Sequence, residues 1–289
     1  MCSSDLPDSS QQITPRIIVT TDFSLESERA FYHALAIAVA RQARLTILHT
    51  GSESRDAVPW HKFPGVRETL AGWGLLPADA PRAAVAETLN VVVAKMSVRD
   101  DDPRQGITDY LRKHPTDLLV MATEGRAGLA RILNPSVADT VSYLTNSHTL
   151  MLPQHGRNFV DPSTGRTQLR RVLCALDSDH DPRPAVAYLR QWLPALGGDA
   201  DMQILWLQTG QPDAVQDILL PQAPGQTWRQ EQRSGEPTKT IIETAREFGA
   251  DLLVLNVRSP LSPMARMRGN RNDRVLRELN IPLLSVPIL

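Results

Sequence analysis

The chain has 289 residues, of which 42% are hydrophobic and 22% charged, and its formal net charge is −1. This balance is typical of a globular protein, and it excludes the strong positive field that would recruit nucleic acid or an anionic membrane surface. The first ten residues lack the basic and apolar regions of a secretion signal, and no apolar stretch approaches the roughly 18 residues of a transmembrane helix. We therefore expect a cytoplasmic protein, and the length favours two domains.

The chain begins with a segment rich in Ser, Asp, Gln and Pro, which predicts a disordered arm at residues 1–14. An apolar run then predicts a strand at 16–22 that ends in a polar turn. Apolar residues at helical spacing follow at 23–41, with Ser24 or Ser27 as the N-cap. These elements open an alternation of strands and helices.

A second strand is expected at 45–51, and strand, helix and strand at this length form a βαβ unit. The run 118–122 has no polar alternation, so it predicts a strand covered on both faces, as in a parallel sheet. The sequence Asn-Pro-Ser at 134–136 suits the start of a helix, and a closing strand follows at 150–152. The N-terminus of that helix points toward the loop after the strand, a junction that can bind an anion.

Four of these elements recur in the same order in the second half of the chain. The repeats lie at 171–177, 204–210, 250–256 and 281–287. The chain is therefore a tandem of two copies that each alternate strands and helices. Such alternation requires a parallel sheet with right-handed crossovers and helices on both faces, so we predict an α/β fold with two doubly wound domains.

Composition also predicts the domain boundaries. Gly, Pro, Ser and Thr cluster between apolar runs at 155–168, which is typical of a linker. We therefore expect the first domain at 15–154 and the second at 169–289.

The two copies differ in their middle part. Gly51 and Asp117 are 66 positions apart, whereas the matching residues Gly210 and Asp251 are 41 apart. The additional residues of the first copy lie within 52–89. They form either one or two short helices over the sheet edge or a flap that binds a partner.

A family resemblance rests on the loop after the strand at 118–122. Ala122, Gly125, Pro135 and Ser136 align with the G-x2-G-x9-G-[ST] signature of the universal stress proteins, with two of its three glycines replaced. The resemblance extends over nearly all of residues 16–289. It implies two five-stranded parallel domains of strand order 3-2-1-4-5, similar to adenine nucleotide alpha hydrolases. It also implies that the two halves pair with each other through their last strands.

The same resemblance implies a site for ATP or another adenine nucleotide, with Mg, in the first domain. Asp22 matches an aspartate that accepts hydrogen bonds from the nucleoside, and Thr50 would offer backbone groups to adenine. An alternative role for Asp22 is to cap the following helix. A ligand crevice is in any case expected here, at the C-terminal ends of the strands near the switch in strand order.

The phosphate loop departs from the family pattern. Pro135 lacks the N–H donor that glycine would supply, and its φ is fixed. Gly125 and Ser136 remain, and the guanidinium groups of Arg126 and Arg131 could supply charge-assisted contacts to phosphate. We therefore expect a weakened nucleotide site in the first domain.

The second copy departs further. Asp177 keeps the nucleoside position, but Gly269 is the only glycine left of the three in the signature. Arg266 and Arg268 belong to an arginine-rich stretch that is either a solvated basic face or a phosphate site built from side chains. We expect a degenerate nucleotide site here.

No catalytic signature is present, and Cys2 and Cys174 give no metal or disulfide framework. The first hypothesis is a non-enzymatic stress-response or regulatory module. An ATP-hydrolysing switch and a nucleotide-free dimerisation scaffold are the alternatives. The expected partners are the other half of the chain, a second copy in a homodimer, or an unidentified protein.

Overall fold

The computed structural model describes most of both halves of the chain. The described residues are 14–54, 57–123, 141, 144–175, 182–197, 201–209, 220–257, 275 and 278–287. The expected arm lies outside them except for residue 14. No helix in these ranges combines the length and apolar character needed to span a membrane.

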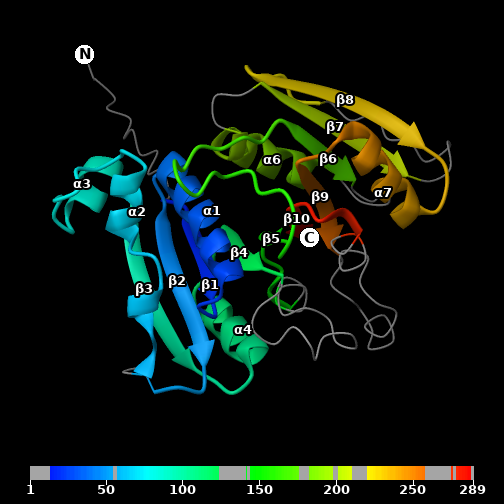
Figure 1. Ribbon diagram of the computed structural model, residues 1–289. Helices are drawn as coiled ribbons and strands as arrows, with labels where there is room; N and C mark the ends of the chain where they lie inside the picture. Colours follow the sequence, from blue (N-terminus) through cyan, green and yellow to red (C-terminus); the bar gives the residue numbers. More distant parts are fainter. Residues whose placement is uncertain are drawn as a thin grey trace, which may run out of the picture.

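Within the described residues the strands form one sheet that runs through both halves (Figure 1). The strands are β1 (Arg16–Thr21), β2 (Arg44–Gly51), β3 (Val92–Arg99), β4 (Leu118–Ala122), β5 (Thr149–Leu152), β6 (Arg171–Ala175), β7 (Met202–Thr209), β8 (Gln226–Arg233), β9 (Leu252–Val257) and β10 (Leu283–Pro287). Their order is β3-β2-β1-β4-β5-β10-β9-β6-β7-β8, so each half has the predicted order 3-2-1-4-5.

The halves join in the middle of this sheet through their last strands. β5 and β10 pair antiparallel, with Leu150 opposite Leu284, whereas the strands within each half pair in parallel. Both leucines are at most 1% exposed, so the junction is part of the core. This is the intrachain pairing that the sequence predicts.

Helices cover both faces of the sheet. They are α1 (Leu25–Arg41), the short 3-10 helix η2 (Trp60–Lys62), α2 (Val66–Gly72), α3 (Ala84–Leu89), α4 (Pro103–Lys113), α6 (Arg183–Gly197) and α7 (Pro237–Phe248). Residues of α1 and α6 belong to one buried cluster, and residues of α4 and α7 belong to another. Neighbouring residues of β1 alternate between the two clusters, which explains why the central strands are apolar without polar alternation.

The segment in which the first copy is longer folds into η2, α2 and α3, beside the outer strand β3 (Figure 1). Leu70 of α2 is fully buried, and Phe63 and Leu76 are 5% exposed. The first interpretation of this segment, short helices at the sheet edge, is therefore confirmed. A partner-binding role stays a prediction.

The segment that composition marks as a linker packs against the first half. Phe159 is 2% exposed and meets the ring of His33 on α1 edge-on, with 4.6 Å between centroids. The indole N–H of Trp73 donates to the carbonyl oxygen of Pro162 at 2.9 Å. Composition predicts a linker at 155–168, and a few apolar side chains within this linker are enough to pack it against the helices.

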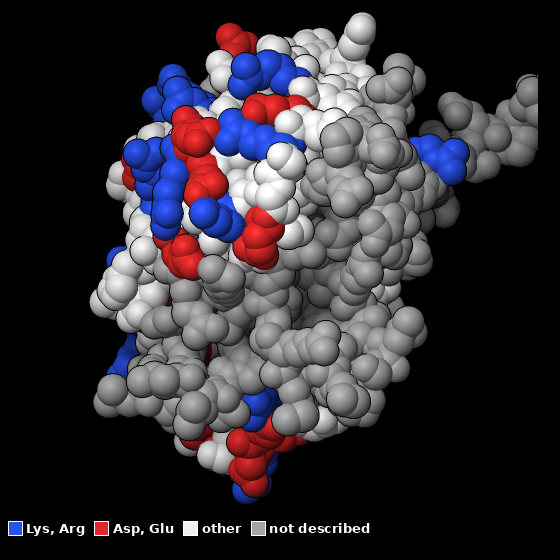
Figure 2. Space-filling model, turned by 90° about the vertical axis from the view of Figure 1, so that its right-hand side faces the viewer, with Lys and Arg blue, Asp and Glu red and all other residues white. Residues whose placement is uncertain are grey.

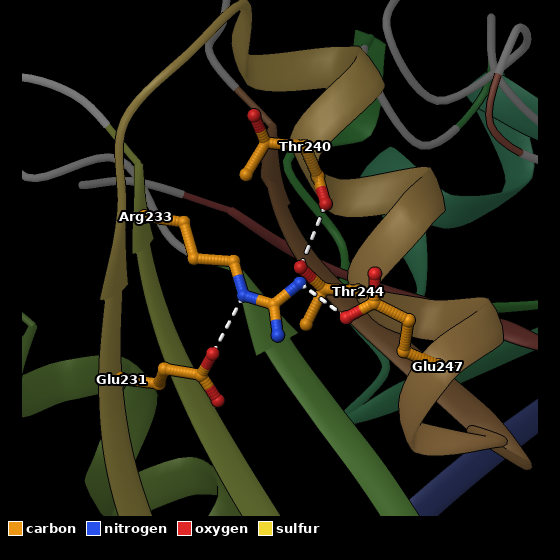
Figure 3. A network of polar contacts seen from close by, with 5 residues as sticks. All are labelled: Glu231, Arg233, Thr240, Thr244 and Glu247. Atoms are coloured by element: carbon orange, nitrogen blue, oxygen red, sulfur yellow. Dashed lines mark hydrogen bonds and ion pairs between the residues drawn. The ribbon is translucent and has the colours of Figure 1, made fainter.

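The outer strand of the second half is held by ionic contacts. Arg233 of β8 reaches Glu231 on its own strand and Glu247 on α7, both at 2.6 Å (Figure 3). Hydrogen bonds to Glu247 and Glu231 raise the pKa of Arg233. The face of the molecule drawn in Figure 2 has basic and acidic side chains interleaved, without a large area of one sign among its coloured residues.

Candidate functional site

The strand order reverses between β1 and β4, and the two strands separate there. Their paired register ends at Val19 and Val120, although β1 continues to Thr21 and β4 to Ala122. Ladder bonds no longer hold the last residues of the two strands together. A crevice at the C-terminal ends of parallel strands, at a switch in strand order, is the usual ligand position in this class of sheet. Asp22, directly after β1, thus lies beside this crevice.

The carboxylate of Asp22 is held in place by the turn that starts α1. Its Oδ1 accepts the backbone N–H of Ser24 at 3.1 Å and also the Ser24 hydroxyl. Ser24 is the N-cap, since its side chain accepts from the backbone N–H of Ser27. The capping alternative for Asp22 is therefore corrected: Ser24 caps the helix, and Asp22 orients Ser24.

Phe23 has a backbone conformation that is unusual for a bulky residue, with φ of 61°. Such conformations cost about 1–3 kcal/mol and cluster at functional sites. The ring packs against an aromatic group formed by His49, Trp60 and Phe63, with centroids 4.7, 5.3 and 5.9 Å away. Sequence reasoning missed this residue because its type gives no hint of positive φ.

Thr50 lies at the end of β2, on the other side of the β1 terminus. The carbonyl oxygen of the next residue, Gly51, accepts the N–H of Asp100 beyond β3. Successive carbonyl groups of a strand point in opposite directions, so that of Thr50 points toward β1. Because β1 ends at Thr21, opposite His49, the Thr50 backbone faces the space just past that end.

His49 fixes the base of the same region. Its Nδ1 lies 2.8 Å from the carbonyl oxygen of Thr21, which can only accept, so Nδ1 carries a proton. The other ring nitrogen, Nε2, is buried and lies 3.6 Å from a carboxylate oxygen of Glu53. The sequence gives one signal for His49, its position next to Thr50 at a strand end.

The structure thus places Asp22, Thr50 and Ala122 at the ends of three neighbouring strands, β1, β2 and β4. The other predicted site residues lie outside the described residues: Gly125, Arg126, Arg131, Pro135, Ser136, Asp177, Arg266, Arg268 and Gly269. The phosphate loop and the arginine-rich stretch therefore stay predictions.

The matching junction of the second half is described only in part, because residues 176–181 lie outside the described ranges. β6 and β9 remain paired up to the last residue of β6, Ala175, which lies opposite Leu255. Asn256 takes the place of Ala122, and its side chain is 9% exposed. Its Oδ1 is buried and has no hydrogen-bond partner within the described part of the chain. A buried oxygen without a hydrogen-bond partner costs free energy, and Asn256 carries this cost at the second junction.

Comparison with known proteins agrees with this architecture. A family model described as "Universal stress protein family" matches residues 14–153 and 172–287. The universal stress protein YxiE of Bacillus subtilis is 26% identical over 146 residues, which are 47% of this chain and 97% of that protein. It therefore matches a single copy of the tandem.

Two solved structures match both halves together. A universal stress protein from Archaeoglobus fulgidus superposes with a TM-score of 0.59 at 16% identity, covering 94% of this chain and 96% of that one. A protein of unknown function from Pseudomonas aeruginosa PAO1 gives 0.61 at 14% identity, with 96% and 94% covered. At these identities the likeness concerns the fold. Together with the two family matches, it shows that this chain belongs to the universal stress protein family and carries two copies of the family's domain.

Proposed function

We propose that the protein is a cytoplasmic regulatory module of the stress response, without catalytic activity, whose first domain binds an adenine nucleotide, ATP foremost. The observation that supports this best is the opening between β1 and β4, where the strands separate after Val19 and Val120. The second domain would not bind a nucleotide in the same way, because its sequence keeps only Gly269 of the three glycines of the signature.

The groups around the opening suit a nucleoside. A carboxylate such as Asp22, already oriented by Ser24, accepts hydrogen bonds from ribose hydroxyls or from an exocyclic amine. The Thr50 carbonyl, which points past the end of β1, would accept a hydrogen bond from the exocyclic amine of adenine. Mg would accompany the phosphates, whose predicted contacts are Gly125, Ser136, Arg126 and Arg131.

The scaffold alternative is weakened by the junction of the two halves. The last strands, through which separate single-domain copies would associate, are already paired with each other in this chain. A homodimer or a complex with another protein would therefore use a different surface.

A thermal shift experiment with ATP, ADP and AMP, with and without magnesium, tests the proposal. A nucleotide at 100 times its dissociation constant should stabilise the chain by about 2.7 kcal/mol. Asp22→Asn keeps an acceptor for Ser24 but removes the carboxylate charge, and it should reduce the shift strongly. Asp102→Asn is the matched control, because Asp102 accepts the N–H of Arg104 at 2.9 Å in a similar turn at the start of α4.

Absence of a shift with all three nucleotides, or an unchanged shift in Asp22→Asn, would contradict the proposal. Sustained phosphate release from ATP and magnesium would instead support the hydrolysing switch. Phosphate release is assigned to this site only if the Asp22→Asn variant loses it and the Asp102→Asn variant keeps it.

A further inference from the structure

A cavity of about 780 Å³ lies at the outer edge of the first domain, and neither Asp22 nor Thr50 lines it. It lies between β3 and the segment that is longer in the first copy, and it is partly open to solvent. The residues that carry its chemistry are Trp60, Phe63, Arg67, Glu68, Arg82 and Lys95. Its volume lies within the range of about 300–1,000 Å³ that is usual for sites of small organic molecules.

The inner wall of the cavity is apolar and firmly packed. Phe63 and Val85 are 5% and 8% exposed, and Val91 is fully buried. The ring of Phe63 is braced by Phe31 of α1, with centroids 5.2 Å apart. The wall therefore keeps its shape without a ligand, which reduces the entropic cost of binding.

Basic groups predominate among the charged residues of the cavity. Arg67, Arg82 and Lys95 line it together with one acidic residue, Glu68. Glu68 lies 3.2 Å from the guanidinium group of Arg67. Burial lowers the pKa of Lys95, and the positive charge of Arg82 lowers it further, while Glu68 acts in the opposite direction. The positive charges of Arg67, Arg82 and Lys95 are thus held near one another, and the single carboxylate of Glu68 does not neutralise all three. A bound anion would relieve their repulsion.

Lys95 is a solvent-exposed residue of β3 that lines the cavity. Side chains alternate along β3, so Lys95 shares its face with Val91, Val93 and Ser97, the face that the additional segment covers. Lys95 Nζ lies 5.2 Å from the centre of the Trp60 ring. The Trp60 indole N–H donates to Ser97 at 3.2 Å, which fixes the ring plane beside the ammonium group.

We propose that this cavity binds an amphipathic organic anion: an aromatic or acyl body that carries one carboxylate, sulfonate or phosphate group. The body would lie against Phe63, Val85 and Val91, and the anionic group would meet Lys95 and Arg82. Trp60 connects the cavity to the nucleotide opening, because its ring also packs against Phe23 at 5.3 Å. This proposal does not depend on nucleotide binding.

The test compares two probes that share one body. 1-Anilinonaphthalene-8-sulfonate is an aromatic anion, and N-phenyl-1-naphthylamine is the same molecule without the sulfonate. We expect calorimetry on the full chain to show one sulfonate probe bound per chain, more tightly than the neutral probe. The double variant Lys95→Gln/Arg82→Gln should weaken the sulfonate about tenfold or more and leave the neutral probe unchanged.

Three further variants make the result specific. Glu68→Gln should tighten sulfonate binding by roughly threefold at an unchanged stoichiometry of one probe per chain, whereas a partly unfolded chain would bind several. Arg99→Gln removes an exposed arginine of the same strand that does not line the cavity, and it should change nothing. Asp22→Asn should also leave the sulfonate unaffected, which separates this site from the nucleotide opening.

The proposal is overturned if the neutral probe binds as tightly as the sulfonate. It is also overturned if the double variant binds the sulfonate like the natural chain, or if Glu68→Gln weakens binding. Circular dichroism melting curves of all variants establish that the compared proteins are folded.

Discussion

The third strand lies at the outer edge of the sheet in both halves, but the two halves protect it differently. β3 is covered by a packed segment with Phe63, Leu70 and Leu76 at its centre. β8 is tied by the ion pairs that Arg233 makes with Glu231 and Glu247 (Figure 3). The first arrangement is an apolar, buried contact, and the second is an ionic contact between partly exposed side chains.

The two solutions leave different surfaces. Folding extra chain over β3 forms a partly open cavity with a packed apolar wall, and the exposed Lys95 contributes a positive charge to its lining. The residues that line the hollow beside β8 include Leu220, Gln226 and Trp228, and none of its described lining residues is charged. The third strand of the sheet therefore lines a candidate ligand site in the first half. In the second half the same strand is held by ion pairs at the surface.

The largest effect in this comparison should come from the packed cover of β3. Leu70→Ala removes a fully buried side chain from α2, and we expect a loss of roughly 4 kcal/mol in the free energy of unfolding. Urea denaturation followed by circular dichroism measures it. Leu75→Ala is the control, because Leu75 is 40% exposed and should lose less than about 1 kcal/mol. Equal losses would mean that the cover does not stabilise the edge.

A smaller effect should appear when the first half is acidified. Burial lowers the pKa of His33 to about 4, while its bond to the Arg29 carbonyl acts in the opposite direction. The unfolded chain takes up this proton near pH 6.5, so the stability is complete above that pH and is lost as pH falls toward 4. The expected loss is about 3 kcal/mol.

Urea titrations at pH 7 and pH 4.5 test this pH dependence. His33→Gln should flatten it, whereas the exposed His61 of η2, changed to Gln, should leave it as in the natural chain. A pH dependence that persists in His33→Gln would show that other groups cause it.

The contact between the halves should respond to acid more weakly. His148 stacks on Tyr188 of α6 with centroids 3.5 Å apart, and the Tyr188 hydroxyl donates to the carbonyl oxygen of Asp117 at 3.2 Å. Burial lowers the pKa of His148 to about 4, and Asp117 opposes this shift. Since His148 is only partly buried, we expect a loss of roughly 2 kcal/mol between pH 6.5 and 4.

The same titrations on His148→Phe, which keeps an aromatic ring for stacking, check this value. The variant should lose part of the acid sensitivity without losing stability at pH 7. A large loss at pH 7 would mean that the imidazole has a role other than stacking.

The sequence identifies the central strands well and the site only in part. Runs such as 118–122 are buried on both faces, so their uninterrupted apolar character predicts parallel strands. The first and last residues of the outer strands β3 and β8 could not be predicted from the sequence. An edge strand has only one neighbouring strand and therefore carries polar residues among its apolar ones. Asp22 was found through its motif, but the φ of Phe23 depends on tertiary packing.

The cavity could not have been predicted either. Its walls come from separate segments, and the sequence does not show that Lys95 of β3 comes near Glu68 and Arg82. Composition alone likewise could not show that the linker at 155–168 packs against α1 through the buried side chain of Phe159.

The smallest effect should come from the ionic cover of β8. Arg233→Ala removes both ion pairs, and since its side chain is 30% exposed we expect a loss of about 1 kcal/mol or less. The loss should shrink in 1 M NaCl, because salt screens exposed charges, whereas the effect of Leu70→Ala should remain. Urea titrations at low and high salt measure both. If Arg233→Ala were as costly as Leu70→Ala and insensitive to salt, β8 would be held by packing, and the contrast between the two edges would fail.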